Sequence, residues 1–442
     1  MLALERVMLK WLVERTLGQV ILTGALTVIL PDSRRLTMGD GSGDGVTIRI
    51  TDRSAVLALL LQPELRTGEL FTDGRLIVEQ GTIYDFLCLV LSQAQKRPSR
   101  LARSVERFRQ TLSLWGQRND PGRSRRNVAH HYDLGDAFYA LFLDPDWQYS
   151  CAYFEHPKQS LADAQLAKKR HIAAKLLLRS GDRVLDIGCG WGGMALYLAQ
   201  VGEVAGVVGV TLSAEQLARA RERATVLGLD DQIEFRLQDY RATPERFERI
   251  VSVGMFEHVG LSFYETFFET CRDRLTDDGV MLLHTIGSSD EPSTTNPWLT
   301  RYIFPGGHLP SLSDMTRVIE CAGLIITDVE VLRLHYALTL RAWRDAFMAR
   351  RQTAEAMFDD RFCRMWEFYL SMAEAAFRHE DVVIFQLQIS RRQENVPLTR
   401  TYIERAETVL KDREQAAVGL RQPSTPEAES HGGALSAQTD FR

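Results

Sequence analysis

A strand that runs directly into a glycine-rich turn is the feature of this 442-residue chain that most restricts its fold. The residues VLDIGCGWGG at 184–193 join β-branched and apolar side chains, typical of a buried strand, to glycines at Gly188, Gly190 and Gly192. A helical pattern follows immediately. A strand, a glycine turn and a helix in this order are typical of open α/β sheets, which bind ligands at the carboxyl ends of their strands.

The same alternation of strand and helix continues after this motif, which predicts an α/β fold with a largely parallel sheet. We predict strands at 183–187, 205–210, 233–237, 249–253, 280–286, 325–332 and 382–389. We predict helices at 192–200, 214–227, 263–274 and 311–322, and further helices rich in Arg, Met and aromatic residues within 340–379. A long insertion separates the fifth strand from the helix at 311.

Composition and charge exclude several classes of protein. With 45% hydrophobic and 25% charged residues the chain is an ordinary globular one, and its length suggests two or three domains, each able to bury a core. A net charge of −5 does not fit a polycation that coats nucleic acid, so we expect no nucleic-acid partner. The six cysteines have no CxxC or zinc-like spacing, which predicts a reducing compartment and no metal site.

The residues before the α/β pattern suggest a separate unit. Residues 1–17 have apolar side chains at helical spacing, and 25–30 and 46–50 have the pattern of strands. Residues 72–80 and 84–91 have the pattern of a turn, a strand and a buried helix. We therefore predict a small N-terminal α+β domain over residues 1–95. No apolar run approaches the roughly 20 residues that a membrane-spanning helix needs.

Two further segments differ sharply from their surroundings. Residues 96–126 contain ten basic and two acidic residues, a net charge of +8. This basic linker can be a solvated helix, or a patch for an anionic phosphate, lipid or nucleic acid, and its sequence leaves both open. Residues 413–442 are rich in Gln, Pro, Ser, Ala and Gly, which predicts a disordered tail.

The glycine turn itself indicates the kind of ligand. Its GxGxG spacing, without a following GK[ST], matches neither the dinucleotide fingerprint nor the P-loop. Asp186, two positions before the first glycine, suits a ligand with an amino group and a ribose, such as S-adenosylmethionine. At the end of the next strand, Thr211 and Gln216 could bond such a ligand, while Ser213 could cap the following helix; both roles can hold together.

Polar residues also follow the third, fourth and fifth strands. Gln238 and Asp239 could meet an adenine amino group, or Asp239 could be a turn residue. Glu257, in GMFEHVG, could act in acid–base chemistry or stabilise a helix dipole. His284, at the end of an apolar strand, could be catalytic or structural. Because Glu257 and His284 come at neighbouring strand ends, a joint role is favoured.

The residues before the glycine motif are unusually aromatic. Residues 127–154 are dense in His, Tyr, Trp and Phe for a surface segment. These side chains could cap the apolar core, or they could line a slot for an apolar substrate above the cofactor. The sequence alone leaves both open.

Seven segments together resemble the cyclopropane fatty acid synthase family, which includes the mycolic acid cyclopropane synthases. They are HHYDLGDAFYALFLD, YSCAYF, VLDIGCGWGG, GVTLSAEQ, VSVGMFEHVG, YIFPGGHLPSL and HYALTLRAW. The resemblance covers about 127–389 and implies a class I methyltransferase fold, with a Rossmann-like, seven-stranded mixed sheet. It implies an S-adenosylmethionine-dependent domain over 127–412 with insertions that form a lipid slot. The N-terminal domain looks like that of the phospholipid-acting members and is a candidate for lipid binding.

The resemblance also implies a reaction. In the family, the cis double bond of an unsaturated phospholipid acyl chain takes the methyl group of S-adenosylmethionine, and the carbocation that forms closes to a cyclopropane ring when it loses a proton. The base is a bound bicarbonate ion. The groups that hold this ion match Cys151, Glu257, His284, Ile286 and Tyr336, with Cys151 and Ile286 contributing backbone groups.

The cofactor-binding positions of the family carry over in the same way. They match Tyr149, Ser150, Asp186, Gly188, Gly190, Gly192, Thr211, Gln216, Gln238 and Asp239. Some members have been assigned a catalytic cysteine in the C-terminal helical region. The corresponding residue here is Ala373, so we assign no cysteine nucleophile.

Three other functions are weighed against this one. The same methyl transfer could end in a methylene or methyl branch, because the fate of the carbocation depends on where the base lies. A small-molecule N-methyltransferase is disfavoured by the retained Glu257, His284 and Tyr336 and by the extra N-terminal domain. The intact glycine loop disfavours a lipid- or nucleic-acid-binding module beside a degenerate methyltransferase. We expect a cytoplasmic enzyme, peripheral at the anionic inner membrane face, and leave open whether it forms a homodimer.

Overall fold

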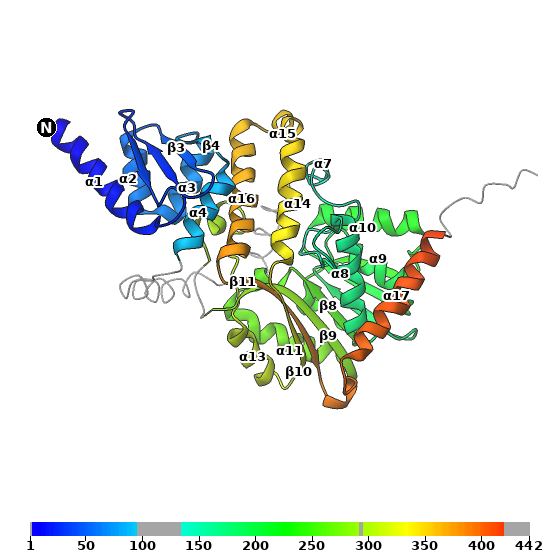
Figure 1. The fold of residues 1–442 in the computed structure, drawn as a ribbon. Helices are drawn as coiled ribbons and strands as arrows, with labels where there is room; N and C mark the ends of the chain where they lie inside the picture. Colours follow the sequence, from blue (N-terminus) through cyan, green and yellow to red (C-terminus); the bar gives the residue numbers. More distant parts are fainter. Residues whose placement is uncertain (1, 95–133, 291–294, 420–442) are drawn as a thin grey trace, which may run out of the picture.

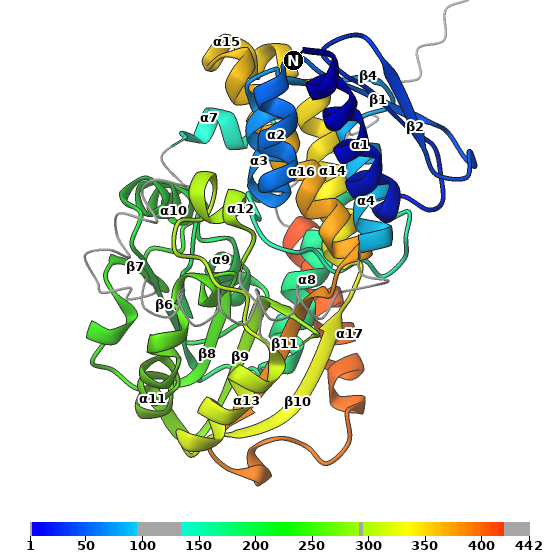
Figure 2. The ribbon, with the colours of Figure 1, turned by 90° about the vertical axis from the view of Figure 1, so that its left-hand side faces the viewer.

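Two β-sheets organise the protein, whose computed structural model describes residues 2–94, 134–290 and 295–419. A four-stranded sheet lies in the N-terminal part and a seven-stranded sheet in the rest. Helices α14 (His335–Ala349) and α16 (Asp360–His379) stand between the N-terminal unit and the larger sheet, as Figure 1 and Figure 2 show from two directions. The basic linker at 96–126 lies outside the described residues.

The N-terminal unit has the predicted α+β character. Its sheet has the order β2-β1-β3-β4, with β1 parallel to β3 and the other neighbours antiparallel. The helix predicted over 1–17, the strands predicted at 25–30, 46–50 and within 72–80, and the helix predicted at 84–91 are all present. The short strand β2 and the helices α2 and α3 were not predicted. The elements are α1 (Leu2–Val20), β1 (Leu26–Ile29), β2 (Arg35–Met38), β3 (Val46–Ile50), α2 (Arg53–Leu61), α3 (Pro63–Thr72), β4 (Leu76–Gln80) and α4 (Ile83–Ala94).

The apolar core of the N-terminal unit extends beyond the unit, contrary to the expectation of one core per domain. A single buried cluster runs from its strands into α14 and α16. Gly68 of α3 shows how close this packing is, because a Cβ atom there would lie 2.5 Å from the Trp298 ring and 2.6 Å from the Phe368 ring. The Tyr302 hydroxyl also donates to Glu69 Oε1 across 2.8 Å. The unit is therefore fixed against the helices that approach the larger sheet.

The larger sheet confirms the predicted seven-stranded mixed sheet. Its order is β10-β11-β9-β8-β5-β6-β7, and β11 runs antiparallel to both neighbours. All seven predicted strands are present, with β9 longer than predicted. They are β5 (Arg183–Ile187), β6 (Gly206–Thr211), β7 (Ile233–Leu237), β8 (Phe247–Val253), β9 (Leu275–Ser288), β10 (Ile325–Leu332) and β11 (Val382–Ser390).

Helices cover both faces of this sheet, which explains why its strands are nearly continuous apolar runs. Val184 of β5 faces a core formed with α8 (Leu161–Lys175), α9 (Gly193–Gln200), α10 (Ala214–Leu227) and α17 (Thr401–Gly419). The next residue, Leu185, faces the opposite core, formed with α11 (Tyr264–Arg274) and α13 (Leu312–Cys321). The alternation of side chains along each strand thus builds a three-layer αβα arrangement.

Short elements complete the described chain. They are α7 (Asp136–Tyr139), η1 (Tyr240–Ala242), η2 (Phe256–His258), η3 (Leu261–Phe263), α12 (Pro297–Tyr302), α15 (Arg351–Met357) and η4 (Gln393–Asn395). Helix α12 lies in the insertion after β9 and brings Trp298 against α3 and α16. The insertion therefore joins the two units.

The aromatic segment before the glycine motif mainly caps the core. Phe138, Tyr139 and Phe142 are almost fully buried and pack edge-on against one another. Phe138 also meets Trp366 of α16 with ring centroids 4.9 Å apart. Of the two predicted roles, capping the core is therefore the one that these three residues have.

The prediction of a disordered tail from residue 413 is wrong at its start. Helix α17 continues to Gly419, and Glu414 is buried within it. The Glu414 carboxylate accepts hydrogen bonds from Arg170 of α8 and from the Tyr197 hydroxyl of α9. These partners hold residues that composition alone assigned to a flexible tail; residues 420–442 lie outside the described chain.

Candidate active site

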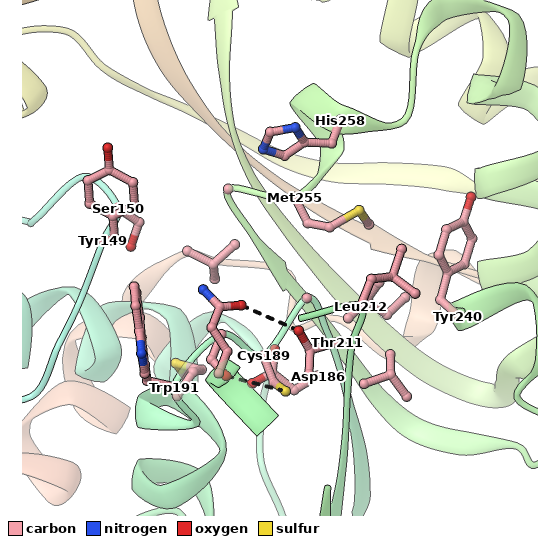
Figure 3. Close-up of a pocket in the computed structure, with 18 of the residues that line it drawn as sticks. Tyr149, Ser150, Asp186, Cys189, Trp191, Thr211, Leu212, Tyr240, Met255 and His258 are labelled. Atoms are coloured by element: carbon pink, nitrogen blue, oxygen red, sulfur yellow. Dashed lines mark hydrogen bonds between the residues drawn. The ribbon is translucent and has the colours of Figure 1, made fainter. Parts of the chain in front are cut away.

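A pocket opens at the carboxyl ends of β5, β6 and β8, beside the point where the strand order reverses between β5 and β8. Open α/β sheets place their ligands at this point. Figure 3 shows Asp186 and Thr211 on one side of the pocket and Met255 and His258 on another. Nine of the ten predicted cofactor-binding residues line it: Tyr149, Ser150, Asp186, Gly188, Gly190, Thr211, Gln216, Gln238 and Asp239.

The glycine turn forms the floor of the pocket. Gly190 has a φ of +54°, and a Cβ atom there would meet nothing within 4 Å, so its backbone faces the open cavity. Gly192 does not line the pocket; with a φ of +83° it is the N-cap residue of α9. A Cβ at Gly192 would lie 2.8 Å from the Phe235 ring. The glycine at 192 therefore serves the turn and its packing.

Asp186 is a buried carboxyl group at the end of β5. It is 1% exposed, and its Oδ2 atom has no hydrogen-bond partner among the described residues. Burial raises the pKa of Asp186 to about 7. A carboxylate in this state gains from a ligand that brings hydrogen-bond donors or positive charge into the pocket.

The end of β6 brings together the two residues predicted there. The Thr211 hydroxyl lies 3.4 Å from Gln216 Oε1 and accepts from the Ser213 amide at 3.2 Å. Ser213 caps α10, accepting from the Gln216 amide at 3.3 Å. Both interpretations of this segment are thus compatible, because Ser213 shapes the turn while Thr211 and Gln216 face the pocket.

The residues after β7 are arranged differently from the simplest expectation. Asp239 lines the pocket, but its carboxylate pairs with the Arg241 guanidinium at 2.6 Å and accepts from the Arg241 amide at 3.0 Å. Gln238 Nε2 donates to the Thr243 hydroxyl at 3.3 Å. Asp239 therefore does serve the turn, and Arg241 is a pocket residue that the sequence did not single out.

A buried lysine of α8 supports the pocket wall that Tyr149 and Ser150 form. Lys168 is 1% exposed, and its ammonium group donates to Ser150 Oγ at 2.9 Å and to Gln148 Oε1. Burial lowers the pKa of Lys168 to about 8. Because the lysine can only donate, it leaves the hydroxyl hydrogen of Ser150 available to another acceptor. The Gln148 side-chain NH2 group donates one hydrogen to Asp146 Oδ2 at 3.0 Å and keeps the other. Gln148 and Lys168 were not predicted.

Aromatic side chains frame the same wall. The Tyr149 ring stacks on Trp343 of α14 with centroids 5.1 Å apart, and its hydroxyl lies 3.1 Å from that of Tyr369. Trp147 and Trp191 also line the pocket, with centroids 5.7 Å apart. Trp147 and Tyr149 follow the alternative role proposed for the aromatic segment, that of lining a ligand site. Trp191 was not predicted as a pocket residue, although its place inside the glycine turn could have indicated this role.

Glu257 and His284 lie behind the pocket at adjacent strand ends. The Gly254 amide, at the pocket wall, donates to the carbonyl oxygen of His284 at 2.9 Å. Glu257 Oε1 accepts from the Ile286 amide at 2.6 Å, so that backbone donor is occupied within the chain. Burial raises the pKa of Glu257 to about 7. Within the described chain, Glu257 Oε2 and His284 Nε2 are both buried without a hydrogen-bond partner.

Cys151 and Tyr336 are two further buried residues of the predicted set. Both belong to the buried cluster that Ile286 also contacts. The Ala152 amide, next to Cys151, donates to the Thr339 hydroxyl of α14 at 3.0 Å, less than one helical turn from Tyr336. The Cys151 thiol donates to the Ala152 carbonyl at 3.2 Å, and burial raises the pKa of this thiol. A protonated, buried thiol fits the prediction that no cysteine is a nucleophile.

Within 2–94, 134–290 and 295–419, no group of three or more His, Cys, Asp or Glu side chains is placed to hold a metal ion. No helix of those ranges is both long and apolar enough to cross a lipid bilayer.

The strand order, the glycine turn after β5 and the pocket at the switch point define a class I, S-adenosylmethionine-dependent methyltransferase. A comparison with family models narrows this class. The chain belongs to the mycolic acid cyclopropane synthetase family, whose model matches residues 119–387.

Individual relatives agree with this assignment. The chain is 38% identical over 352 residues to the cyclopropane-fatty-acyl-phospholipid synthase of Escherichia coli, covering 79% of this chain and 88% of that one. It is 37% identical over 281 residues to the tuberculostearic acid methyltransferase UfaA1 of Mycobacterium tuberculosis, covering 61% and 65%. The crystal structure of the mycolic acid cyclopropane synthase CmaA1 with SAH and CTAB matches with a TM-score of 0.57 and 34% identity, covering 60% of this chain and 97% of that one.

The raised pKa of Asp186 predicts a pH-dependent stability. A carboxyl group whose pKa rises on folding stabilises the protein below its unfolded pKa of about 4, and this contribution is lost as the pH rises through about 7. Asp186→Asn removes the free-energy cost of ionising this buried carboxyl group. We expect the free energy of unfolding of the variant, relative to the ligand-free parent, to increase between pH 5 and pH 8 by on the order of 2–3 kcal/mol, measured by urea denaturation.

The exposed Asp231 provides the control for this experiment. The free energy of unfolding of Asp231→Asn should differ from that of the parent by the same small amount at both pH values. Parallel stability curves for Asp186→Asn and the parent would contradict the burial argument.

Proposed function

We propose that the protein transfers a methylene unit from S-adenosylmethionine to the cis double bond of unsaturated phospholipid acyl chains, forming cyclopropane fatty acids. The observation that carries this proposal is the match to the Escherichia coli phospholipid synthase, which extends over 352 residues, well beyond the range of the family model. The mycobacterial relative aligns over 281 residues. The longer alignment favours a phospholipid as the substrate.

The pocket supports S-adenosylmethionine as the methyl donor. The cofactor carries an ammonium group, a carboxylate and a ribose. In our proposal, the buried Asp186 carboxylate accepts from the ammonium group, and Ser150 and Gln148, polarised by Lys168, donate to the carboxylate. Thr211 and Gln216 hold the ribose hydroxyls. Gln238 contacts the adenine in our proposal, rather than Asp239, since the Asp239 carboxylate already pairs with Arg241.

The cluster behind the pocket supports bicarbonate as a bound base. Bicarbonate both accepts and donates hydrogen bonds, and the two unpartnered buried atoms described for Glu257 and His284 can supply one acceptor and one donor. When bound, it would accept the proton that the methylated acyl chain loses. Glu257, His284 and Tyr336 would orient the ion, and Cys151 would contribute its backbone. Ile286 would act indirectly, since its amide holds Glu257.

A different ending of the same reaction is the second candidate. A carbocation can also lose its proton to give a methylene branch, and a methyl branch forms only if a separate hydride donor then reduces that double bond. The observation that favours this candidate is the 37% identity to a tuberculostearic acid methyltransferase. The identities to this methyltransferase and to the Escherichia coli synthase, 37% and 38%, are nearly equal and do not separate the two products. The position of the base relative to the acyl chain decides between them.

The membrane is the expected place of the reaction. The basic linker at 96–126 supplies ten cationic residues that an anionic phospholipid surface would attract. Leu57 and Leu61 of α2 add exposed apolar side chains on the N-terminal unit that the linker follows. We propose peripheral binding to the inner, anionic membrane face from the cytoplasm. Assembly as a homodimer stays a prediction.

The first test is the identity of the lipid product. The purified protein is incubated with S-adenosylmethionine and vesicles containing a cis-monounsaturated phospholipid, and the fatty acids are analysed by mass spectrometry and proton NMR. We expect each modified chain to gain one CH2 and to carry cyclopropane ring protons. A product with the same mass but vinylidene protons would support the methylene-branched alternative. Methylation of added amines with no modified lipid would contradict the proposal.

The second test concerns bicarbonate. In buffer depleted of carbon dioxide we expect the rate to fall and to recover when bicarbonate is added. Tyr336→Phe should raise the bicarbonate concentration needed for half of the maximal rate and lower kcat by about ten-fold or more, with the KM for S-adenosylmethionine unchanged. Tyr402→Phe, which removes a hydroxyl from α17, is the matched control. A rate that is indifferent to bicarbonate would exclude this base.

The third test concerns the basic linker. Replacing Arg100, Arg103 and Arg107 with Glu should weaken sedimentation with phosphatidylglycerol-containing vesicles, at about 1 kcal/mol per charge near the surface. The same reversal at the exposed Arg179, Arg392 and Arg400 controls for net charge. Equal binding by both triple variants, or binding that salt does not weaken, would remove the linker from the membrane contact.

A further inference from the structure

A glutamine lies directly behind the candidate catalytic histidine. Gln386 of β11 is the cross-strand partner of His284 of β9, so the two side chains share one face of the sheet. The Gln386 Nε2 and His284 Nδ1 atoms are 3.1 Å apart. Both residues are almost completely shielded from water, with exposed fractions of 0% and 1%. This contact determines which ring nitrogen of His284 can carry the proton.

Lys175 fixes the orientation of the Gln386 amide. The Lys175 ammonium group, at the end of α8, donates to Gln386 Oε1 at 2.9 Å. Because an ammonium group can only donate, the oxygen of the amide must face Lys175 and its NH2 group must face His284. His284 Nδ1 is then an acceptor and carries no proton. In the neutral ring the proton is therefore on Nε2, the atom that has no partner within the described chain.

Lys175 is itself held by a buried chain of ionic contacts. It pairs with Glu330 of β10, which also bonds His171 Nε2 at 2.7 Å. The other nitrogen, His171 Nδ1, lies 2.6 Å from Glu407 Oε1 of α17. Although burial opposes its charge, hydrogen bonds to these two carboxylates raise the pKa of His171, which fits an imidazolium that donates from both nitrogens. The chain thus leads from His284 to the partly exposed Glu407.

The charges around His284 act in the same direction. Lys168, His171 and Lys175 face it from α8, His335 from α14, and Gln386 from β11. The Glu257 carboxylate, after β8, accepts from the backbone amide of Ile286, two residues from His284, and burial raises its pKa. Burial, followed by the positive charges of Lys168 and Lys175, lowers the pKa of His284 far below its usual range. The ring is therefore neutral as well as fixed.

We propose that Gln386 and Lys175 are positioning residues that lock His284 as the neutral tautomer with its proton on Nε2, so that the ring presents a fixed N–H donor to an anion bound beside Glu257. This inference rests on the proposed function and deepens it, since it assigns roles to two residues outside the predicted site. A histidine free to exchange tautomers would offer that donor only part of the time. The lock also prevents the ring itself from competing with the bound anion for the departing proton.

The first experiment reads the tautomer without any reaction. The ligand-free protein is labelled with 15N-histidine, and the His284 ring signals are assigned by their loss in His284→Ala. We expect a pyridine-like Nδ1 and a pyrrole-like Nε2 throughout pH 6–9. In Gln386→Glu a carboxylate acceptor replaces the amide donor while Lys175 can still donate to the other carboxylate oxygen, so the proton should move to Nδ1. A parent ring protonated on Nδ1, or a tautomer unchanged in Gln386→Glu, would overturn the proposal.

The second experiment measures the consequence for the reaction. Gln386→Leu and Lys175→Met should each lower kcat by about ten- to a hundred-fold, raise the bicarbonate requirement, and leave the KM for S-adenosylmethionine unchanged. A purely structural role would not separate kcat from KM in this way, nor would it move the tautomer.

Gln388 provides a matched control, since it lies two residues along the same strand and face. It donates to the Lys175 carbonyl and to the Tyr402 hydroxyl but is not among the partners of His284. Gln388→Leu should lower stability to a similar degree while the tautomer and kcat stay unchanged. An equal loss of kcat in Gln388→Leu and Gln386→Leu would overturn the proposal. If the tautomer is as expected but no lipid product forms, the proposed function fails and the lock stands.

Discussion

The structure depends on one helix that buries its positive charge. Five basic side chains of α8 are at most 7% exposed: Lys168, Lys169, Arg170, His171 and Lys175. A buried charge without a partner costs several kcal/mol, so each of these groups must find an acceptor within the fold. The acceptors come from the pocket wall, from β10 and β11, and from α17. Helix α8 therefore determines where those elements can lie.

Several partners of α8 belong to the candidate site. Lys168 holds Gln148 and Ser150 at the pocket, and Lys169 pairs with Asp146 a few residues earlier. On the far side, Arg170 holds Glu414 of α17. Removing one partner leaves the other charge buried, a loss of about 3–5 kcal/mol. The position of the pocket wall and the length of α17 are thus consequences of the same requirement.

Much of the fold could be predicted because its signals are local. The glycine turn and the buried strands carry their pattern within a few residues, and nine of ten cofactor positions line one pocket. The role of α8 could not be predicted, since LADAQLAKKRHIAAK has the composition of an exposed helix. Its partners are remote, with Glu414 lying 244 residues from Arg170. Because the partners of Glu414 are so remote in the sequence, the residues after 413 were assigned to a flexible tail.

The charges of α8 also act on both parts of the candidate site, the cofactor pocket and the cluster around His284. Lys168 and Lys175 place positive charge behind the pocket and behind His284, while Asp186 and Glu257 each have a pKa raised to about 7 by burial. Glu330 already pairs with Lys175, whereas the Lys168 ammonium group donates to the uncharged side chains of Gln148 and Ser150. The proposed cofactor carboxylate beside Ser150 would gain from the charge of Lys168, and so would an anion bound beside Glu257, because that charge also acts at His284. One buried helix can thus prepare separate places for two anionic groups on either side of the Gly254 backbone.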